Sequence, residues 1–235
     1  MNLRDSLVAA IDLIRSGDPQ VVAAVAVSLH VALVATALSS IFGLCLGFAV
    51  ASRRFRGRRL VEVLLNTSTA MPTVVVGLLT YAVLSRRGLL GDFGLLYSPA
   101  AMIIGQTILI TPLIAALATA VIGGADPRIH QTALTLGASR FRAAVTVCTE
   151  LRTGLLAAVA TGFGRLISEL GIALMVGGNI EGVTRTMTTA IALETSKGEF
   201  ALGLALGLIL MLVALTVNAA VVVSGGALAR DRHEK

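Results

Sequence analysis

The sequence predicts an all-α integral membrane protein with five membrane-spanning helices and a short amphipathic helix at its N-terminus. Hydrophobic residues make up 56% of its 235 residues and charged residues 14%, whereas soluble domains carry about 25% charged residues. The mean hydropathy is +0.89. Long runs lack Asp, Glu, Lys and Arg, and none alternates with the two-residue period of a membrane β-strand. This composition excludes a disordered or an ordinary cytosolic protein, and it makes nucleic-acid binding a poor explanation of the net charge of +6.

Residues 1–18 are predicted to form an external amphipathic helix. Apolar residues recur there at helical spacing, with charged residues elsewhere around the helix; the apolar positions are Leu3, Leu7, Val8, Ile11 and Ile14. We expect this helix to lie on the outer membrane interface as an anchor. There is no basic stretch before the first long apolar run, so no cleaved signal peptide is expected.

The five spans follow from the spacing of charged residues. A helix needs about 20 mainly apolar residues to cross the hydrocarbon, and four charge-free stretches reach that length. A fifth is interrupted only by Arg165 and Glu169. The predicted transmembrane domain covers residues 19–228, with spans near 22–50, 61–84, 99–122, 153–177 and 201–224.

The distribution of Lys and Arg predicts the orientation of the spans. Twelve basic residues fall on one side of the predicted spans and six on the other. The twelve are Arg53, Arg54, Arg56, Arg58, Arg59, Arg128, Arg140, Arg142, Arg152, Arg230, Arg232 and Lys235. We therefore expect a multi-pass membrane protein with its N-terminus outside and the tail, residues 229–235, in the cytoplasm.

The cytoplasmic segment 126–152 is predicted to form two short helices that meet at a glycine. Asp126 is a candidate N-cap followed by proline at the first helical position, Gly137 can adopt the left-handed conformation that ends a helix, and Ser139 can cap the next one. Such a knob is suited to docking in a groove of a partner. An interfacial segment lying on lipid headgroups would explain the arginines but not the sequence Thr-Ala-Leu-Thr-Leu-Gly-Ala-Ser.

At this segment the sequence resembles a known family. Gln131-Thr132-Ala133-x-x-x-Gly137-Ala138-Ser139 is similar to the EAA-x-x-x-G motif of ABC importer permeases. It departs from the motif at Gln131, where glutamate is usual, and at Thr149-Glu150, where Leu-Pro is common. Further stretches resemble the molybdate, tungstate and sulfate permeases, most closely the tungstate type: Ala70–Leu79, Arg165-x-x-x-Glu169-x-Gly171, Gly178-Asn179 and Thr184–Gly198.

The resemblance implies the membrane domain of a type I ABC importer in the bacterial cytoplasmic (inner) membrane, not an enzyme. Two copies of the chain would form a homodimer, two cytoplasmic ABC ATPases would dock on the knobs, and an external solute-binding protein would deliver tungstate or a similar tetrahedral oxyanion for import by alternating access. The docking residues would be Gln131, Thr132, Ala133, Gly137, Ala138 and Ser139. The sequence lacks a G-x-x-x-x-G-K-[ST] phosphate loop, so ATP and Mg²⁺ would be bound by the ATPase.

Two other functions stay open. A molybdate or sulfate permease would share the same motifs. A free-standing secondary transporter would show internal repeats and paired interrupted helices, which we do not find. No spacing of His, Cys, Asp and Glu predicts a metal site or a membrane enzyme.

Seven residues are candidates for the translocation path or its gate. Arg165 and Glu169 lie four residues apart, and on a continuous helix they would share one face; they would either form an ion pair that fixes span 4 or shape the anion path. Pro72 would kink span 2, as a packing feature or as a hinge. Asn179, Thr186, Thr188 and Thr189 offer neutral donors for an oxyanion, or contact the delivery protein.

Overall fold

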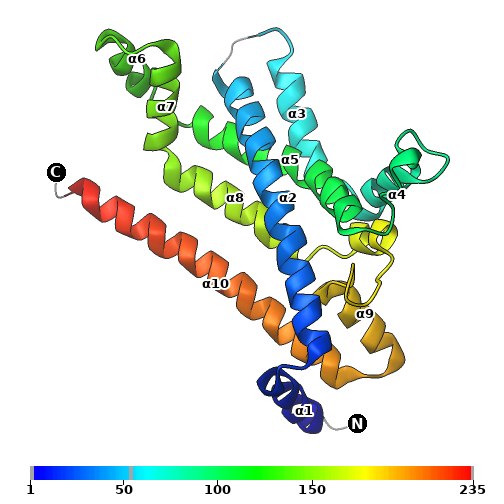
Figure 1. The fold of residues 1–235 in the computed structure, drawn as a ribbon. Coiled ribbons are helices and arrows are strands. Elements are labelled where there is room, and N and C mark those ends of the chain that lie inside the picture. The colour runs from blue at the N-terminus through cyan, green and yellow to red at the C-terminus, as the bar shows by residue number, and fades with distance from the viewer. Residues whose placement is uncertain (1–2, 53–54, 234–235) are drawn as a thin grey trace. The chain divides into compact units, whose positions relative to one another are not determined.

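The computed structural model describes residues 3–52 and 55–233, and these ranges contain helices and no strand (Figure 1). Three helices are long and apolar enough to cross a membrane: α2 (Pro19–Ser52), α5 (Pro99–Gly123) and α10 (Phe200–His233). The predicted all-helical membrane fold is confirmed.

Two bent helix pairs bring the number of possible spans to five. One pair is α3 (Arg58–Ser68) with α4 (Thr73–Leu84), and the other is α7 (Arg140–Glu150) with α8 (Arg152–Ile167). The first pair differs from the continuous helix expected at span 2. In the second pair the bend lies at Leu151, where the predicted cytoplasmic segment meets the predicted span 4.

Pro72 lies at the break in span 2, where α3 and α4 are bent by 98°; the bend expected there takes the form of a break between two helices and not of a kink inside one. The α3 helix ends at Ser68, and Pro72, with φ −63° and ψ 122°, directly precedes α4. Proline has no N–H to donate and disfavours helical backbone in the residue before it. It therefore begins a new helix here instead of bending an existing one.

The N-terminal helix α1 (Leu3–Ser16) has the predicted amphipathic pattern. Its apolar residues Leu7, Val8, Ile11 and Ile14 are exposed, while Ser6 and Ala10 are buried. Asp18 then caps α2, because its Oδ1 accepts from the backbone N–H groups of Gln20 at 2.9 Å and Val21 at 3.2 Å.

The chain divides into two compact units. One comprises Met1–Ala37, Met71–Leu109 and Phe163–Thr216. The other comprises Leu38–Ala70, Ile110–Gly162 and Val217–Lys235. Arg53, Arg54 and Lys235, which contributed to the predicted orientation, lie outside the described residues.

In the second unit, α2 approaches α5 closely at two glycines. A Cβ on Gly43 would lie 2.9 Å from the side chain of Ile114, and one on Gly47 would lie 2.7 Å from Cβ of Ala118. Glycine allows this approach because it has no side chain. On α10, by contrast, nothing among the described residues lies within 4 Å of a Cβ added to Gly207.

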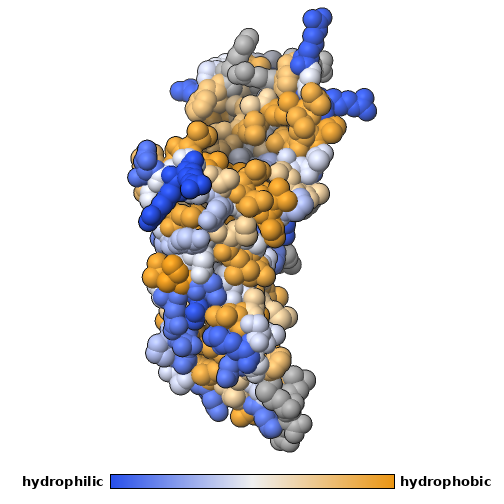
Figure 2. All heavy atoms as spheres, turned by 90° about the vertical axis from the view of Figure 1, so that its right-hand side faces the viewer, coloured by the Kyte–Doolittle hydropathy of each residue, from blue (hydrophilic) through white to orange (hydrophobic). Residues whose placement is uncertain are grey.

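Much of the surface is apolar, as Figure 2 shows for one face. On α10 the side chains of Met211, Leu212 and Leu215 are exposed. Exposed apolar side chains in such number are expected where lipid, not water, surrounds a helix.

Candidate functional site

The predicted knob is formed by α6 (Pro127–Thr135) and α7, which pack against each other (Figure 1). Asp126 caps α6 by accepting from the N–H of Arg128 at 2.9 Å, and Ser139 caps α7 by accepting from the N–H of Arg142 at 3.3 Å. Gly137 between them has φ +83°. The local structure that the sequence predicts for this segment is confirmed.

The knob also exposes large apolar side chains that the motif residues did not include, and two of them are far more exposed than Leu134 and Val145. Leu136 is 82% exposed and Phe141 is 77% exposed, while Ala143 and Val147 are buried on the other side of α7. Leu136 and Phe141 flank Gly137 in the sequence, and their hydrophobicity beside this glycine is the signal that could have identified them. Gln131, Thr132 and Ser139 are exposed as well. The knob therefore offers a surface that a partner can cover.

The predicted span 4 is interrupted where Glu169 caps a new helix. The α8 helix ends at Ile167, and a short helix follows whose last part is the π-helical segment η2 (Ala173–Gly177). Glu169 is 4% exposed, and its Oε1 accepts from the backbone N–H groups of Gly171 at 2.8 Å and Ile172 at 3.3 Å. Its carboxylate thus satisfies two N–H groups that have no partner within the helix.

Of the two alternatives for Arg165 and Glu169, the ion pair on one continuous helical face is not found in the described residues. The two residues lie on either side of the helix end, and the ion pairs found among the described residues do not include one between them. Arg165 is exposed on the last turn of α8. Its charge is left available to a ligand or to another chain.

The threonines expected to face an oxyanion instead make hydrogen bonds within the fold. Thr186 and Thr189 form a reciprocal cap at the start of α9 (Met187–Lys197). The hydroxyl of Thr188 donates to the backbone oxygen of Glu169 at 2.8 Å, and that of Thr184 donates to the oxygen of Gly177. All four side chains are buried. They connect the start of α9 to the cap and to the end of η2.

The segment after Glu169 packs tightly onto α4 and α5. A Cβ on Gly171 would lie 2.6 Å from Oγ1 of Thr73, and one on Gly77 would lie 3.1 Å from Cβ of Met175. On α5, a Cβ on Gly105 would lie 2.8 Å from the side chain of Ile172. Glycines on three elements therefore fix the position of the short helix that Glu169 caps.

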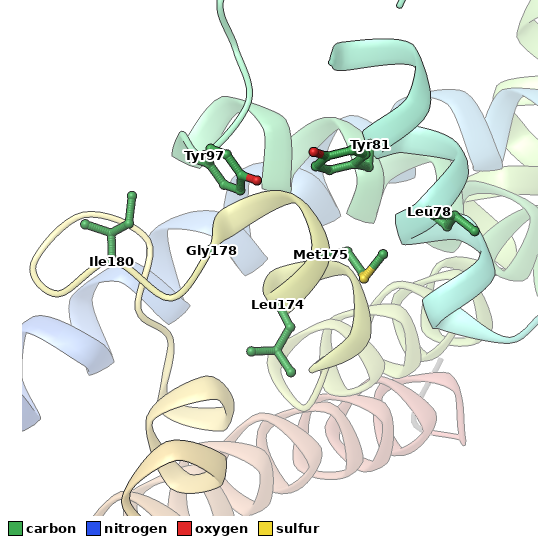
Figure 3. Close-up of a pocket in the computed structure, with 7 residues that line it drawn as sticks. All are labelled: Leu78, Tyr81, Tyr97, Leu174, Met175, Gly178 and Ile180. Atoms are coloured by element: carbon green, nitrogen blue, oxygen red, sulfur yellow. The ribbon is translucent and has the colours of Figure 1, made fainter. Parts of the chain in front are cut away.

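An open cavity of about 620 Å³ lies between η2, the following loop, α4 and the residues before α5. Figure 3 shows the hydroxyls of Tyr81 and Tyr97 facing each other at this cavity. The two ring centroids are 6.5 Å apart, with 61° between the ring planes. No motif in the sequence singled out these tyrosines. Asn179, also expected at the path, follows the cavity residue Gly178 and has φ +53°.

Comparisons with known proteins place this architecture in a family. Residues 43–229 match the family described as the inner membrane component of binding-protein-dependent transport systems. The chain belongs to this family. It is a multi-pass inner membrane transport component, and its helices are apolar enough to span the membrane.

Several proteins similar to this transport component are named after tungstate or molybdenum. A tungstate uptake system permease of Peptoclostridium acidaminophilum is 38% identical over 91% of this chain and 93% of its own length. A tungstate uptake system permease of Campylobacter jejuni is 44% identical over 70% of this chain and 69% of its own length. A molybdenum transport system permease of Escherichia coli is more distant, at 30% identity over 75% of this chain and 81% of its own length.

Solved structures confirm the fold of a type I ABC importer membrane domain. A chain of the MetNI methionine ABC transporter in an inward-facing conformation matches with a TM-score of 0.71, covering 88% of this chain and 95% of that chain. A bacterial alginate ABC transporter matches with a TM-score of 0.73, covering 93% of this chain and 82% of that chain. Both are 16% identical in sequence, so the likeness concerns the fold alone.

Proposed function

We propose that the chain is the permease subunit of an ATP-driven importer for tungstate or a similar tetrahedral oxyanion. The observation that carries this proposal is the 38% identity to a tungstate permease over 91% of the chain. Molybdate and sulfate permeases are the alternative, and their lower identities of 30% and 28% favour tungstate.

The active assembly contains two copies of the chain, two cytoplasmic ATPases and an external solute-binding protein. The family description, which names dependence on a binding protein, supports the external partner. The exposed Leu136 and Phe141 beside Gly137 support docking of an ATPase on the α6–α7 knob, since apolar side chains exposed at the cytoplasmic face gain stability when covered. ATP and Mg²⁺ are bound by that ATPase, and the N-terminus of the permease lies outside with the C-terminus in the cytoplasm.

Arg165 lines the anion path in this proposal. A charged side chain in a membrane span rarely faces lipid and is expected to face a water-filled cavity or a partner. With Glu169 committed to its helix cap, the guanidinium of Arg165 is free to attract an anion during alternating access. Residues of the α9 region, including Thr186, Thr188 and Thr189, then act by holding the capped helix rather than by contacting the anion. Asn179 lies where the loop leaves this helix, and Pro72 stands at the hinge between α3 and α4.

The experiment is copurification of the ATPase with the permease, followed by uptake of tungstate into proteoliposomes supplied with the loaded binding protein. In the Gly137→Val variant we expect loss of the ATPase, because valine is strained at φ +83° and reshapes the junction of α6 and α7. Nothing lies within 4 Å of a Cβ at Gly137, so the change acts through the backbone alone.

Gly182→Val is the matched control. Gly182 has φ +72° and equally open surroundings, but it lies in the loop before α9. This variant should retain the ATPase at the wild-type ratio. If both variants retained the ATPase equally, the knob would not be the docking site. A wild-type permease that copurifies with no ATPase would favour a secondary transporter.

A further inference from the structure

We propose that Tyr81 and Tyr97 form a transient binding site for a tetrahedral oxyanion, which the substrate occupies on its way past the helix that Glu169 caps. This inference rests on the proposed transport function and names a contact site within it. Both tyrosines of the chain lie at the same cavity, although they are 16 positions apart in the sequence. Tyr81 extends from α4, while Tyr97 lies in the loop before α5 (Figure 3).

The backbone around Tyr97 is built to hold its ring in one place. Tyr97 has φ +63°, a left-handed conformation that is strained for a residue with a side chain. Its N–H donates to the oxygen of Val176 in η2 at 2.9 Å. Its ring lies against Gly178, where an added Cβ would be 2.7 Å from Cδ1 of the tyrosine. Strained backbone that is held by its surroundings is typical of functional sites.

The cavity lining suits weak binding of an anion. The other lining residues are uncharged and mostly apolar; they are Leu78, Leu174, Met175, Gly178 and Ile180. No carboxylate among these described residues repels an anion, and no cation holds it too firmly for onward transport. The hydroxyls of the two tyrosines face each other (Figure 3) and are close enough to hydrogen-bond to one another, so an arriving oxyanion would replace that bond and accept one hydrogen bond from each hydroxyl.

The state of the hydroxyls and the size of the cavity agree with this role. A hydrogen bond with the side chain of Tyr81 is the main cause that raises the pKa of Tyr97 above its ordinary value. Tyr97 is therefore protonated at neutral pH, as a tyrosine ordinarily is, and remains a donor. The cavity of about 620 Å³ exceeds the volume of one tetrahedral oxyanion, so the anion retains part of its hydration shell. The buried threonines that carry the same chemical group are occupied within the fold, which leaves the tyrosines as the hydroxyls aimed into a cavity here.

The two tyrosines supply a direct probe of this site. The chain has no other tyrosine and no tryptophan, so the tyrosine emission of the purified full-length chain comes from this cavity alone. We expect tungstate and molybdate to change the emission with a saturable dependence on concentration, and chloride at equal ionic strength to leave it unchanged. In Tyr81→Phe and Tyr97→Phe, which keep the rings, the anion should bind about two- to tenfold more weakly because one neutral hydrogen bond is lost.

Uptake by the complete complex provides the second measurement. With saturating loaded binding protein, the maximal rate of tungstate uptake should fall by a similar factor in each variant and further in the double variant. Ser196→Ala removes an exposed hydroxyl on α9 and should leave the rate unchanged. A wild-type uptake rate in the double variant, or an emission that no oxyanion alters, would overturn the proposal.

Two other outcomes can be distinguished from the proposed one: the tyrosines contact the delivery protein, or the complex does not transport tungstate. If the variants need more loaded binding protein for half-maximal uptake at an unchanged maximal rate, the tyrosines contact the delivery protein and the oxyanion site is refuted. If the wild-type complex imports no tungstate, the proposed transport function fails on its own. In that case the emission titrations with tungstate, molybdate and sulfate still decide whether an oxyanion binds here.

Discussion

Replacing Glu169 by alanine removes the acceptor that begins the helix over residues 171–177. The backbone N–H groups of Gly171 and Ile172 would both lose their bond to Oε1, and Ile172 is fully buried. Loss of an N-cap costs about 0.5–2 kcal/mol, and a buried donor left unpaired costs about 1–3 kcal/mol. We expect the two losses to lower the free energy of unfolding by about 2–3 kcal/mol.

Replacing Glu169 by glutamine separates the cap from the charge. Glutamine keeps a side-chain oxygen that can accept from the same two N–H groups, although a neutral acceptor forms weaker bonds than a carboxylate. The expected loss is about 1 kcal/mol. A change of 1 kcal/mol shifts Tm by about 2–4 °C in a chain of this size, so Tm should fall by about 5–10 °C in the alanine variant and about 2–4 °C in the glutamine variant.

The assay is thermal unfolding of the purified permease together with tungstate uptake by the assembled complex. The alanine variant should still assemble but transport poorly, whereas the glutamine variant should retain most of the uptake. Glu181→Gln is the control, because the Glu181 side chain is 56% exposed and a glutamine oxygen can still accept from Arg185, whose side chain is 17% exposed. If the glutamine variant lost as much Tm and as much uptake as the alanine variant, the charge of Glu169 and not its helix cap would account for both losses. That result would refute the capping role as their cause.

Two other predictions concern residues around this helix. Arg165→Gln should lower the maximal uptake rate several-fold while leaving Tm unchanged, because the side chain is exposed in the permease chain; uptake at the wild-type rate would exclude Arg165 from the path. Gly77→Ala should lower the stability by about 1–3 kcal/mol through overpacking against Met175 and Ile172, measured as a fall in Tm. Gly207→Ala, with open space around its Cβ, should be neutral or raise the stability by up to about 1 kcal/mol, and a loss at Gly207 equal to that at Gly77 would contradict the role of close packing.

Features that depend on neighbouring residues in the sequence were predictable. The α6–α7 knob depends on Asp126, Gly137 and Ser139, and each acts on a backbone within three residues of itself. The spans were predictable as well, because each depends on one continuous apolar run of the sequence. The start of α9 is also local, since Thr186 and Thr189 form their cap three residues apart. The hydroxyls of these threonines have the chemistry of an anion site, and only their position at the start of the helix shows that they cap it instead.

Features that depend on distant contacts could not be predicted. The spacing of Arg165 and Glu169 indicates one helical face only if the helix continues, and the break follows from how the next segment packs, with Gly171 against Thr73 and Ile172 against Gly105. Nothing in the sequence near Tyr97 reveals its left-handed backbone, which is held by Val176 and Gly178 far along the chain. The sequence near Tyr97 therefore does not indicate the tyrosine cavity.

The π-helical turn in η2 holds one residue more than a regular turn would need. A π-helix has about one more residue per turn than an α-helix, so the five residues Ala173–Gly177 cover nearly the same rotation as four α-helical residues. Deleting one residue here would restore a regular helix while Gly177 still faces Thr184 and Gly178 still faces Tyr97. A one-residue deletion within this turn should therefore be tolerated better than one between Gly178 and Thr184, where no helical turn can absorb the change.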